Sequence, residues 1–293
     1  TDLVGRVVVL FGTNNSSFYE DSNAVVILDN VGRVTCAEVS DIDGDGDLDV
    51  VVCEFGHIEG SVLWLEQNQN GTFVRHVLDE RPGAIHAYPH DADGDGDIDI
   101  ASVISQTHEV VMLYENVGGE FVNHTLFKAG MDYFGMTGLF IEDFDGDSDI
   151  DLGFTNGAQW DGDTPQGVDL RDLHGFRILQ NEGNLSYVLH NVTNVFGAYT
   201  VTSLDYDNDG DIDVFLGTHQ SVSAYPNVEP QSLFLLRQTT ELDFEKIEIP
   251  TQYSQFMTIY EGYDGVGDLL VGTYFNSGDS ATRISSIVIN FEC

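Results

Sequence analysis

The sequence is short of positive charge. Ten Lys and Arg residues stand against fifty Asp and Glu residues, which gives a formal net charge of -40 in a chain of 293 residues. Such a chain repels the phosphates of nucleic acids and the anionic headgroups of membranes. We therefore exclude nucleic acid as a partner.

The sequence also has no long apolar run. None approaches the ~18 residues that a bilayer-spanning helix needs, so we expect no membrane insertion.

Cysteine is scarce as well. The three cysteines are Cys36, Cys53 and Cys293, which allow at most one internal disulfide. Cys36 and Cys53 fall on two consecutive predicted strands, so they form the possible pair. Buried free thiols are the alternative.

What the sequence does contain is a repeated acidic motif of nine residues in which Asp occupies every second position. Its copies begin at Asp41, Asp91, Asp143 and Asp205. A period of this length is typical of propeller blades or solenoid repeats. The alternating aspartates are Asp41, Asp43, Asp45, Asp47, Asp49; Asp91, Asp93, Asp95, Asp97, Asp99; Asp143, Asp145, Asp147, Asp149, Asp151; and Asp205, Asp207, Asp209, Asp211, Asp213.

This spacing indicates calcium chemistry. Alternating carboxylates bring several hard oxygen ligands into one tight turn, and the intervening glycines let them face one point. A solvated turn has no need of five aspartates that repel one another. We predict about four Ca²⁺ sites, with carboxylates from positions 1, 3, 5 and 9 and the backbone carbonyl of position 7, so the position-7 side chains can be bystanders. A fifth copy, ending at Asp268, keeps Asp264 but has Tyr260 and Gly262 at the first two ligand positions, so we expect weak or no binding there.

Each unit also contains four β-like segments, here called a, b, c and d in chain order. In the first unit they are residues 34–40, 48–55, 61–66 and 72–78, and the Asp motif always lies between a and b. The pattern predicts an all-β fold with blades at about residues 31–80, 81–130, 131–194, 195–250 and 251–293.

These Asp motifs and their spacing resemble the FG-GAP or VCBS repeat family over about residues 31–293. The resemblance implies a β-propeller of the kind found in integrin α-chains, some fungal lectins and some polysaccharide lyases. Its members adhere to proteins, bind sugars or catalyse reactions, so the resemblance does not select a function.

The ends of the chain suggest how a ring would close. Segment 6–12 matches c, Asn23–Asn30 matches d, and the last unit has only a, b and c. We predict a five-bladed β-propeller over residues 23–293, closed by Asn23–Asn30, because closure removes exposed sheet edges. Residues 1–22 then form an extension with a surplus strand. That strand either pads the propeller, belongs to an upstream domain, or adds to a neighbouring molecule and builds a filament.

The side opposite the Asp motifs is the candidate ligand-binding rim, because aromatic rings stack on sugars and imidazoles transfer protons. A single His or Tyr in a loop is more often an ordinary packed or solvated residue. The sequence shows no Ser/His/Asp set, phosphate loop or H-E-x-x-H motif. The rim candidates are His57, His86, Tyr88, His108, Tyr133, Trp160, His174, Tyr199, His219 and Tyr274.

Glycosylation sequons are in mild excess, which favours a secreted or cell-surface glycoprotein if the source is eukaryotic. They lie at Asn14 or its neighbour Asn15, and at Asn70, Asn123, Asn184 and Asn191.

Three function hypotheses follow. The first is a non-enzymatic extracellular module for assembly or adhesion, stabilised by calcium, whose partner is a second copy or another extracellular protein. The second is a lectin that binds a glycan on the rim. The third is a polysaccharide lyase, which the scarcity of Lys and Arg disfavours because a lyase must neutralise a uronate.

Overall fold

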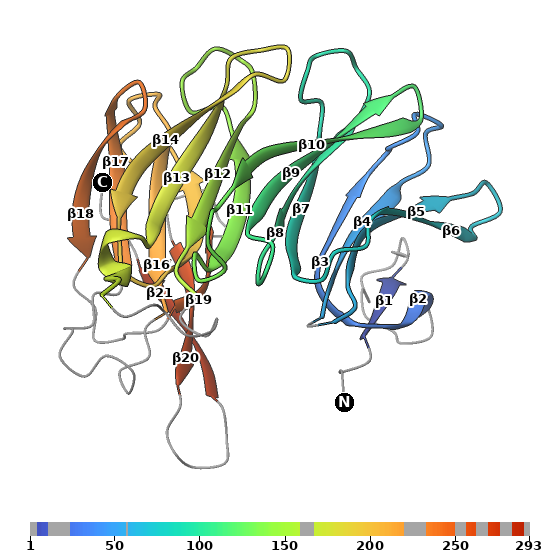
Figure 1. Cartoon of the computed structure of the whole chain (residues 1–293), viewed down its shortest axis with the longest axis horizontal. Helices are drawn as coiled ribbons and strands as arrows, with labels where there is room; N and C mark the ends of the chain where they lie inside the picture. The colour runs from blue at the N-terminus through green and yellow to red at the C-terminus, as the bar shows by residue number, and fades with distance from the viewer. Residues whose placement is uncertain are drawn as a thin grey trace. The chain divides into compact units, whose positions relative to one another are not determined.

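The computed structural model describes residues 5–10, 24–56, 58–158, 167–219 and 233–249, and the backbone of 256–261, 269–275 and 283–289 (Figure 1). The chain divides into two compact units, Thr1–Lys128 and Ala129–Cys293. Antiparallel strands account for nearly all regular structure in the described residues, with one 3₁₀ turn at Leu170–Asp172. The predicted all-β fold is confirmed.

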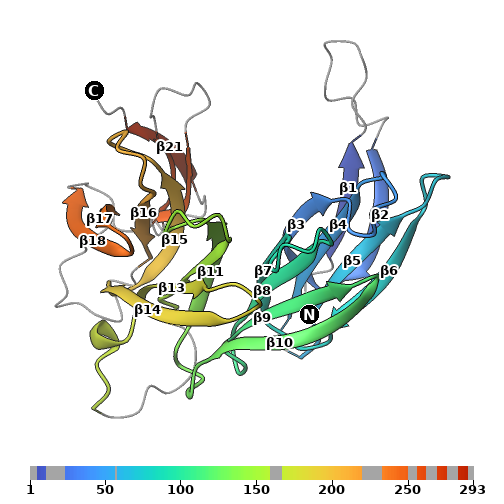
Figure 2. The ribbon, with the colours of Figure 1, turned by 90° about the horizontal axis from the view of Figure 1, so that it is seen from above.

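The first unit contains a hairpin and two four-stranded sheets, which follow one another in chain order (Figures 1 and 2). The hairpin is β1 (Gly5–Leu10) and β2 (Ala24–Val31). The first sheet is β3 (Arg33–Ser40), β4 (Asp49–Phe55), β5 (Ser61–Gln67) and β6 (Phe73–Asp79); the second is β7 (Ala84–His90), β8 (Asp99–Ile104), β9 (Val110–Val117) and β10 (Glu120–Lys128).

The second unit contains two further four-stranded sheets and one of three strands. The third sheet is β11 (Met136–Glu142), β12 (Asp151–Asn156), β13 (Gly175–Asn181) and β14 (Tyr187–Asn194). The fourth is β15 (Ala198–Leu204), β16 (Asp213–Thr218), β17 (Leu233–Thr240) and β18 (Asp243–Ile249); the last is β19 (Phe256–Glu261), β20 (Leu269–Phe275) and β21 (Arg283–Ile289). One sheet therefore lies in each predicted blade, an arrangement that fits propeller-like blades within each unit.

The core of each unit lies between consecutive sheets. In the first four sheets, strands b and c are rich in apolar residues on both faces and are buried, as in the runs Val50–Cys53 and Val62–Leu65. Strand d contains half-buried and exposed residues in approximate alternation, as expected at an edge. Val51 and Trp64 of the first sheet pack with Ile100 of the second, and Phe176 of the third packs with Val214 of the fourth.

A β-bulge near the start of strand a recurs in every sheet from the first to the fifth. In two sheets the bulged residue is a threonine that bonds to the next sheet. The Thr35 hydroxyl donates to the carbonyl oxygen of Ala84 at 3.0 Å, and that of Thr137 donates to the carbonyl oxygen of Ala198 at 2.9 Å. The bulge thus fixes consecutive sheets to each other, a device that the hydrophobic pattern alone does not predict.

The two N-terminal strands form a hairpin. The strand predicted to be surplus is β1, and it has an antiparallel partner in β2. Val7 of β1 is buried with Val50, Val52 and Leu63 of the first sheet, because its apolar face packs on that sheet. The alternative in which this segment pads the sheets is therefore the better interpretation. The closing of a ring by Asn23–Asn30 stays a prediction.

Candidate metal centres

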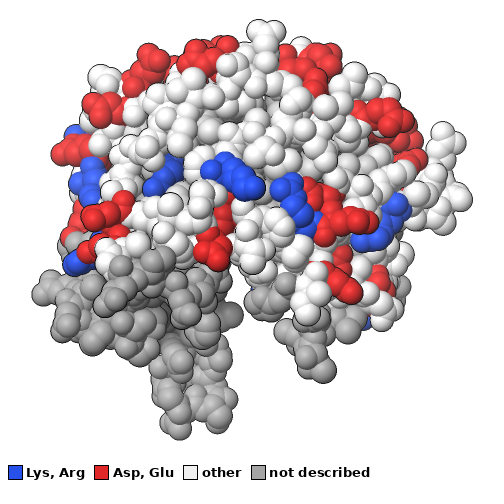
Figure 3. All heavy atoms as spheres, in the orientation of Figure 1, with Lys and Arg blue, Asp and Glu red and all other residues white. Residues whose placement is uncertain are grey.

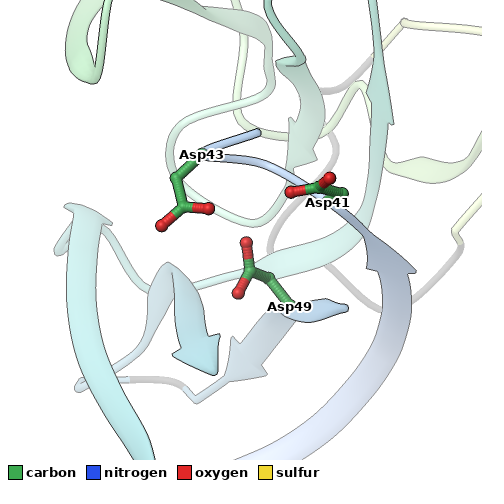
Figure 4. A group of neighbouring side chains, drawn as sticks. All are labelled: Asp41, Asp43 and Asp49. Carbon is green, nitrogen blue, oxygen red and sulfur yellow. The ribbon is translucent and has the colours of Figure 1, made fainter. Parts of the chain in front are cut away.

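Each Asp motif forms the loop between strands a and b, and each brings three carboxylates together. The triads are Asp41, Asp43 and Asp49; Asp91, Asp93 and Asp99; Asp143, Asp145 and Asp151; and Asp205, Asp207 and Asp213. Within a triad, one oxygen of each residue lies within 4.8 Å of the others. Figure 4 shows the three side chains of the first loop converging on one space. Positions 1, 3 and 9 of every motif could hold a metal ion.

The position-9 aspartate anchors each loop. Asp49 is fully buried; its Oδ2 accepts the N–H of Ile42 at 3.0 Å, and its Oδ1 accepts the N–H of Gln67 on strand c at 2.8 Å. The other three copies repeat both bonds, with distances between 2.7 and 2.9 Å: Asp99 with Ala92 and Asn116, Asp151 with Phe144 and Asn181, and Asp213 with Tyr206 and Gln238. The carboxylate therefore joins the loop to strand c.

The triads hold uncompensated negative charge. Burial, together with the neighbouring loop carboxylates and against the lowering effect of the backbone N–H bonds, raises the pKa of Asp99 to about 6 and that of Asp151 to about 7. Burial likewise raises the pKa of Asp49 and of Asp213. A cation placed among the carboxylates would remove this penalty.

The donor set fits Ca²⁺. Every side chain of a triad offers hard oxygen ligands, which calcium prefers and which thiolate-seeking metals do not. In the first loop, Oδ1 of Asp41 is buried and has no hydrogen-bond donor among the described residues. A buried carboxylate oxygen without a donor is costly unless a cation contacts it. Asp41, Asp43 and Asp49 would hold the ion.

Three of the four carboxylates predicted as ligands in each loop belong to the triads. Position 5 lies outside the triads, and its side chain accepts the N–H of position 7 in its own loop, as Asp45 does from Asp47 at 2.8 Å. At position 7, Asp97 has a role of its own, since its Oδ2 accepts the N–H of Gly118 at 3.0 Å. Asp264 and Asp268 of the fifth copy lie outside the described residues.

Two positions at the end of strand c were missed by sequence reasoning. The first is an amide residue whose backbone N–H bonds to the position-9 aspartate: Gln67, Asn116, Asn181 or Gln238. Two of these side chains also reach the Asp loop of the preceding sheet, where Asn116 donates to the carbonyl oxygen of Ile42 and Gln238 to that of Phe144. The second is the residue immediately before this amide residue in the sequence. It lies beside the position-3 aspartate of the same sheet and is Glu66, Glu115, Gln180 or Arg237. The signal was present: in each of the first four units a charged or polar residue and then an amide follow the apolar run of strand c.

The predicted rim residues do not all lie in loops. His86 and Tyr88 belong to β7, and Tyr199 belongs to β15. In both sheets strand a begins one residue before its bulge, so it includes these residues, which were predicted to lie in the preceding connection. His108 and Tyr133 are in connections, His174 precedes β13 and His219 follows β16. His57 and Trp160, and the side chain of Tyr274, lie outside the described residues.

Burial lowers the pKa of the rim histidines His86, His174 and His219. It lowers the pKa of His86 to about 4, and burial together with the charge of Arg177 lowers that of His174 to about 4. Among the described rim residues, rings pair with each other at two places: His86 with Tyr88, parallel at 6.3 Å, and Tyr199 with His219 at 5.3 Å. These pairs belong to different units, and His174 is fully buried.

The cysteines and sequons are placed as follows. Cys36 and Cys53 lie directly opposite each other on β3 and β4 as free thiols, so they are adjacent and the disulfide stays a prediction. The sequon side chains of Asn70, Asn123, Asn184 and Asn191 are exposed. Asn14 and Asn15 lie outside the described residues, as does Cys293. Among the described helices, none has the length and apolar character to cross a bilayer.

Comparison with known proteins matches one part of the chain to a family. A search of curated proteins finds no match. A crystal structure of a protein from Lactobacillus plantarum aligns with 98% of this chain and 83% of its own, at 12% identity and a TM-score of 0.45. The model of the FG-GAP-like repeat matches residues 41–102, which include the first two Asp loops. The resemblance predicted from the Asp motifs is thereby confirmed for residues 41–102, which are similar to an FG-GAP-like repeat.

Proposed function

We propose that this chain is a calcium-stabilised, non-enzymatic module of an extracellular protein, acting in adhesion or assembly. The observation that carries the proposal is the set of four equivalent Asp triads, each anchored by a buried position-9 aspartate. An ion in each loop would offset the repulsion among its carboxylates and would join strands a, b and c of one sheet. Calcium binding would then contribute directly to folding stability.

Two features support an extracellular setting. The four described sequons are exposed, so a glycan on any of them would point into water. The chain is acidic, with fifty Asp and Glu against ten Lys and Arg, and Figure 3 shows Asp and Glu side chains along the upper edge of the visible face and among the Lys and Arg side chains across its middle. Such a surface keeps a concentrated protein soluble in a medium rich in cations.

The proposal assigns partner recognition to the connections opposite the Asp loops. The partner is a second copy or another extracellular protein. If β1 added to a sheet edge of a second copy, the copies would form a filament. One edge of β1 is already paired with β2, so only its other edge could do this. The ring pair Tyr199 and His219 favours glycan binding as the second candidate, because adjacent rings offer apolar faces to a sugar.

A calorimetric titration of the metal-free protein tests the calcium role. We expect Ca²⁺ to bind to more than one site per chain, and Mg²⁺ at the same concentration to bind more weakly, because Mg²⁺ demands octahedral geometry and keeps its waters. A chain that binds no Ca²⁺, or that binds both ions alike, would contradict the proposal. Sedimentation with and without Ca²⁺ tests self-association, and binding to a glycan array in Ca²⁺ would favour the lectin.

A further inference from the structure

The four Asp triads are alike, but the strand-c residue beside each of them is not. This residue immediately precedes the amide that bonds to position 9. In chain order it is Glu66, Glu115, Gln180 and Arg237. The formal charge beside the loop therefore changes from negative in the first two sheets to neutral in the third and positive in the fourth.

In the first sheet the residue adds a carboxylate next to position 3. Glu66 and Asp43 line the same cavity of about 580 Å³, and Oε2 of Glu66 lies 2.7 Å from Nε2 of His76. The second sheet repeats the contact, with Oε2 of Glu115 2.6 Å from Nε2 of His124. Each glutamate is thus held in place by a histidine of strand d.

In the third and fourth sheets the same position meets position 3 differently. Nε2 of Gln180 donates to Oδ2 of Asp145 at 2.6 Å, and Oε1 of Gln180 lies 2.7 Å from Nε2 of His190. In the fourth sheet, Nη1 of Arg237 lies 4.0 Å from Oδ2 of Asp207, and Nη2 of Arg237 bonds to Glu245 of strand d. A guanidinium therefore lies where the other loops have a carboxylate or an amide.

We propose that this strand-c residue grades the four loops as calcium sites, and that Arg237 makes the fourth loop the weakest. The proposal rests on the calcium role assigned above. A divalent ion close to a guanidinium is repelled, whereas one close to Glu66 or Glu115 gains a further attraction. In the fourth loop, Arg237 provides part of the positive charge that the carboxylates require, and an ion must compete with it.

Exchanging these residues between sheets provides the test. Arg237→Gln gives the fourth loop the side chain of the third, and Arg237→Glu gives it that of the first. We expect Ca²⁺ affinity at the weakest site to rise about tenfold or more for Arg237→Glu, and less for Arg237→Gln. Arg171→Glu is the matched control, because Arg171 pairs with Asp169 on an exposed 3₁₀ turn in the same unit and makes the same charge change.

The site that changes is identified by a second substitution. Asp207→Asn should leave the tight Ca²⁺ ions of the wild-type chain unchanged and should abolish the gain made by Arg237→Glu. Gln180→Arg gives the third loop the guanidinium and should remove one of the tighter ions, which tests the idea should the Arg237 variants fail to fold. Circular dichroism verifies the fold of each variant, and isothermal titration counts the ions.

The outcomes separate this inference from the proposed function. If the wild-type chain binds four ions with equal affinity and the Arg237 variants match Arg171→Glu, the grading is wrong while the calcium role stands. If neither the wild-type chain nor any variant binds Ca²⁺, both are wrong. A gain for Arg237→Glu that survives Asp207→Asn places the effect at another loop and also overturns the grading.

Discussion

The two ends of each sheet differ in how far they repeat. At the Asp-loop end, position 9 makes the same two backbone bonds in four copies, at 2.7 to 3.0 Å. At the opposite end, the connections between strands b and c span residues 56–60, 105–109, 157–174 and 219–232, and the last two are much longer. Charge and buried N–H groups impose one arrangement at the Asp-loop end, whereas the connections at the opposite end differ in length.

Removal of calcium should produce the largest effect, because it acts on every loop at once. A ligand at about a hundred times its dissociation constant stabilises a fold by ~2.7 kcal/mol for each site. With several sites, we expect chelation to lower the melting temperature by more than about 10 °C. Thermal circular dichroism with and without chelator measures this change, and added Ca²⁺ should reverse it. An unchanged melting temperature would contradict the proposal that Ca²⁺ bound in the Asp loops stabilises the fold.

A single loop substitution should have an intermediate effect that depends on position within the motif. Asp49→Asn places an amide NH₂ against a buried backbone N–H, so we expect a loss of about 2 to 3 kcal/mol in the free energy of unfolding. Asp47→Asn lies two residues away, outside the triad, and should cost less than about 0.5 kcal/mol. Denaturant unfolding in saturating Ca²⁺ compares the two variants. Equal costs would mean that position 9 is not the anchor.

The repetition also explains what the sequence could predict. Strand segments and Asp loops were predicted closely, as for residues 61–66 against β5, because apolar runs and turn residues are local signals. The pairing of β1 with β2 was not predicted, because the same pattern also allows Asn23–Asn30 to pair with the last unit of the chain. The strand-a bulges and the role of Glu66 or Arg237 were missed because they depend on contacts between strands. The position-9 aspartate was predicted as a metal ligand. Its hydrogen bond to a backbone N–H of strand c was not predicted, because it depends on where strand c lies relative to the loop.

At the connecting end, His174 offers a smaller effect with a definite pH dependence. The side chain is fully buried, its Nδ1 accepts the N–H of Gly197 at 3.3 Å, and its ring stacks on Phe196 at 5.4 Å. Burial, aided by Arg177, lowers its pKa to about 4, below the ~6.5 of an unfolded chain. The unfolded state therefore takes up a proton that the folded state refuses, and stability falls as the pH decreases from about 6.5 to 4.

The loss from His174 should reach about 2 kcal/mol at pH 5. His174→Phe keeps the stacking ring and removes the titration, so its free energy of unfolding should fall less between pH 7 and pH 5 than that of the wild-type chain. His108→Phe, at a half-exposed position in the connection between β8 and β9, is the control and should follow the wild type. All three are compared in saturating Ca²⁺, where the Asp loops contribute equally and cancel. Parallel pH profiles for His174→Phe and the wild type would contradict the lowered pKa of His174.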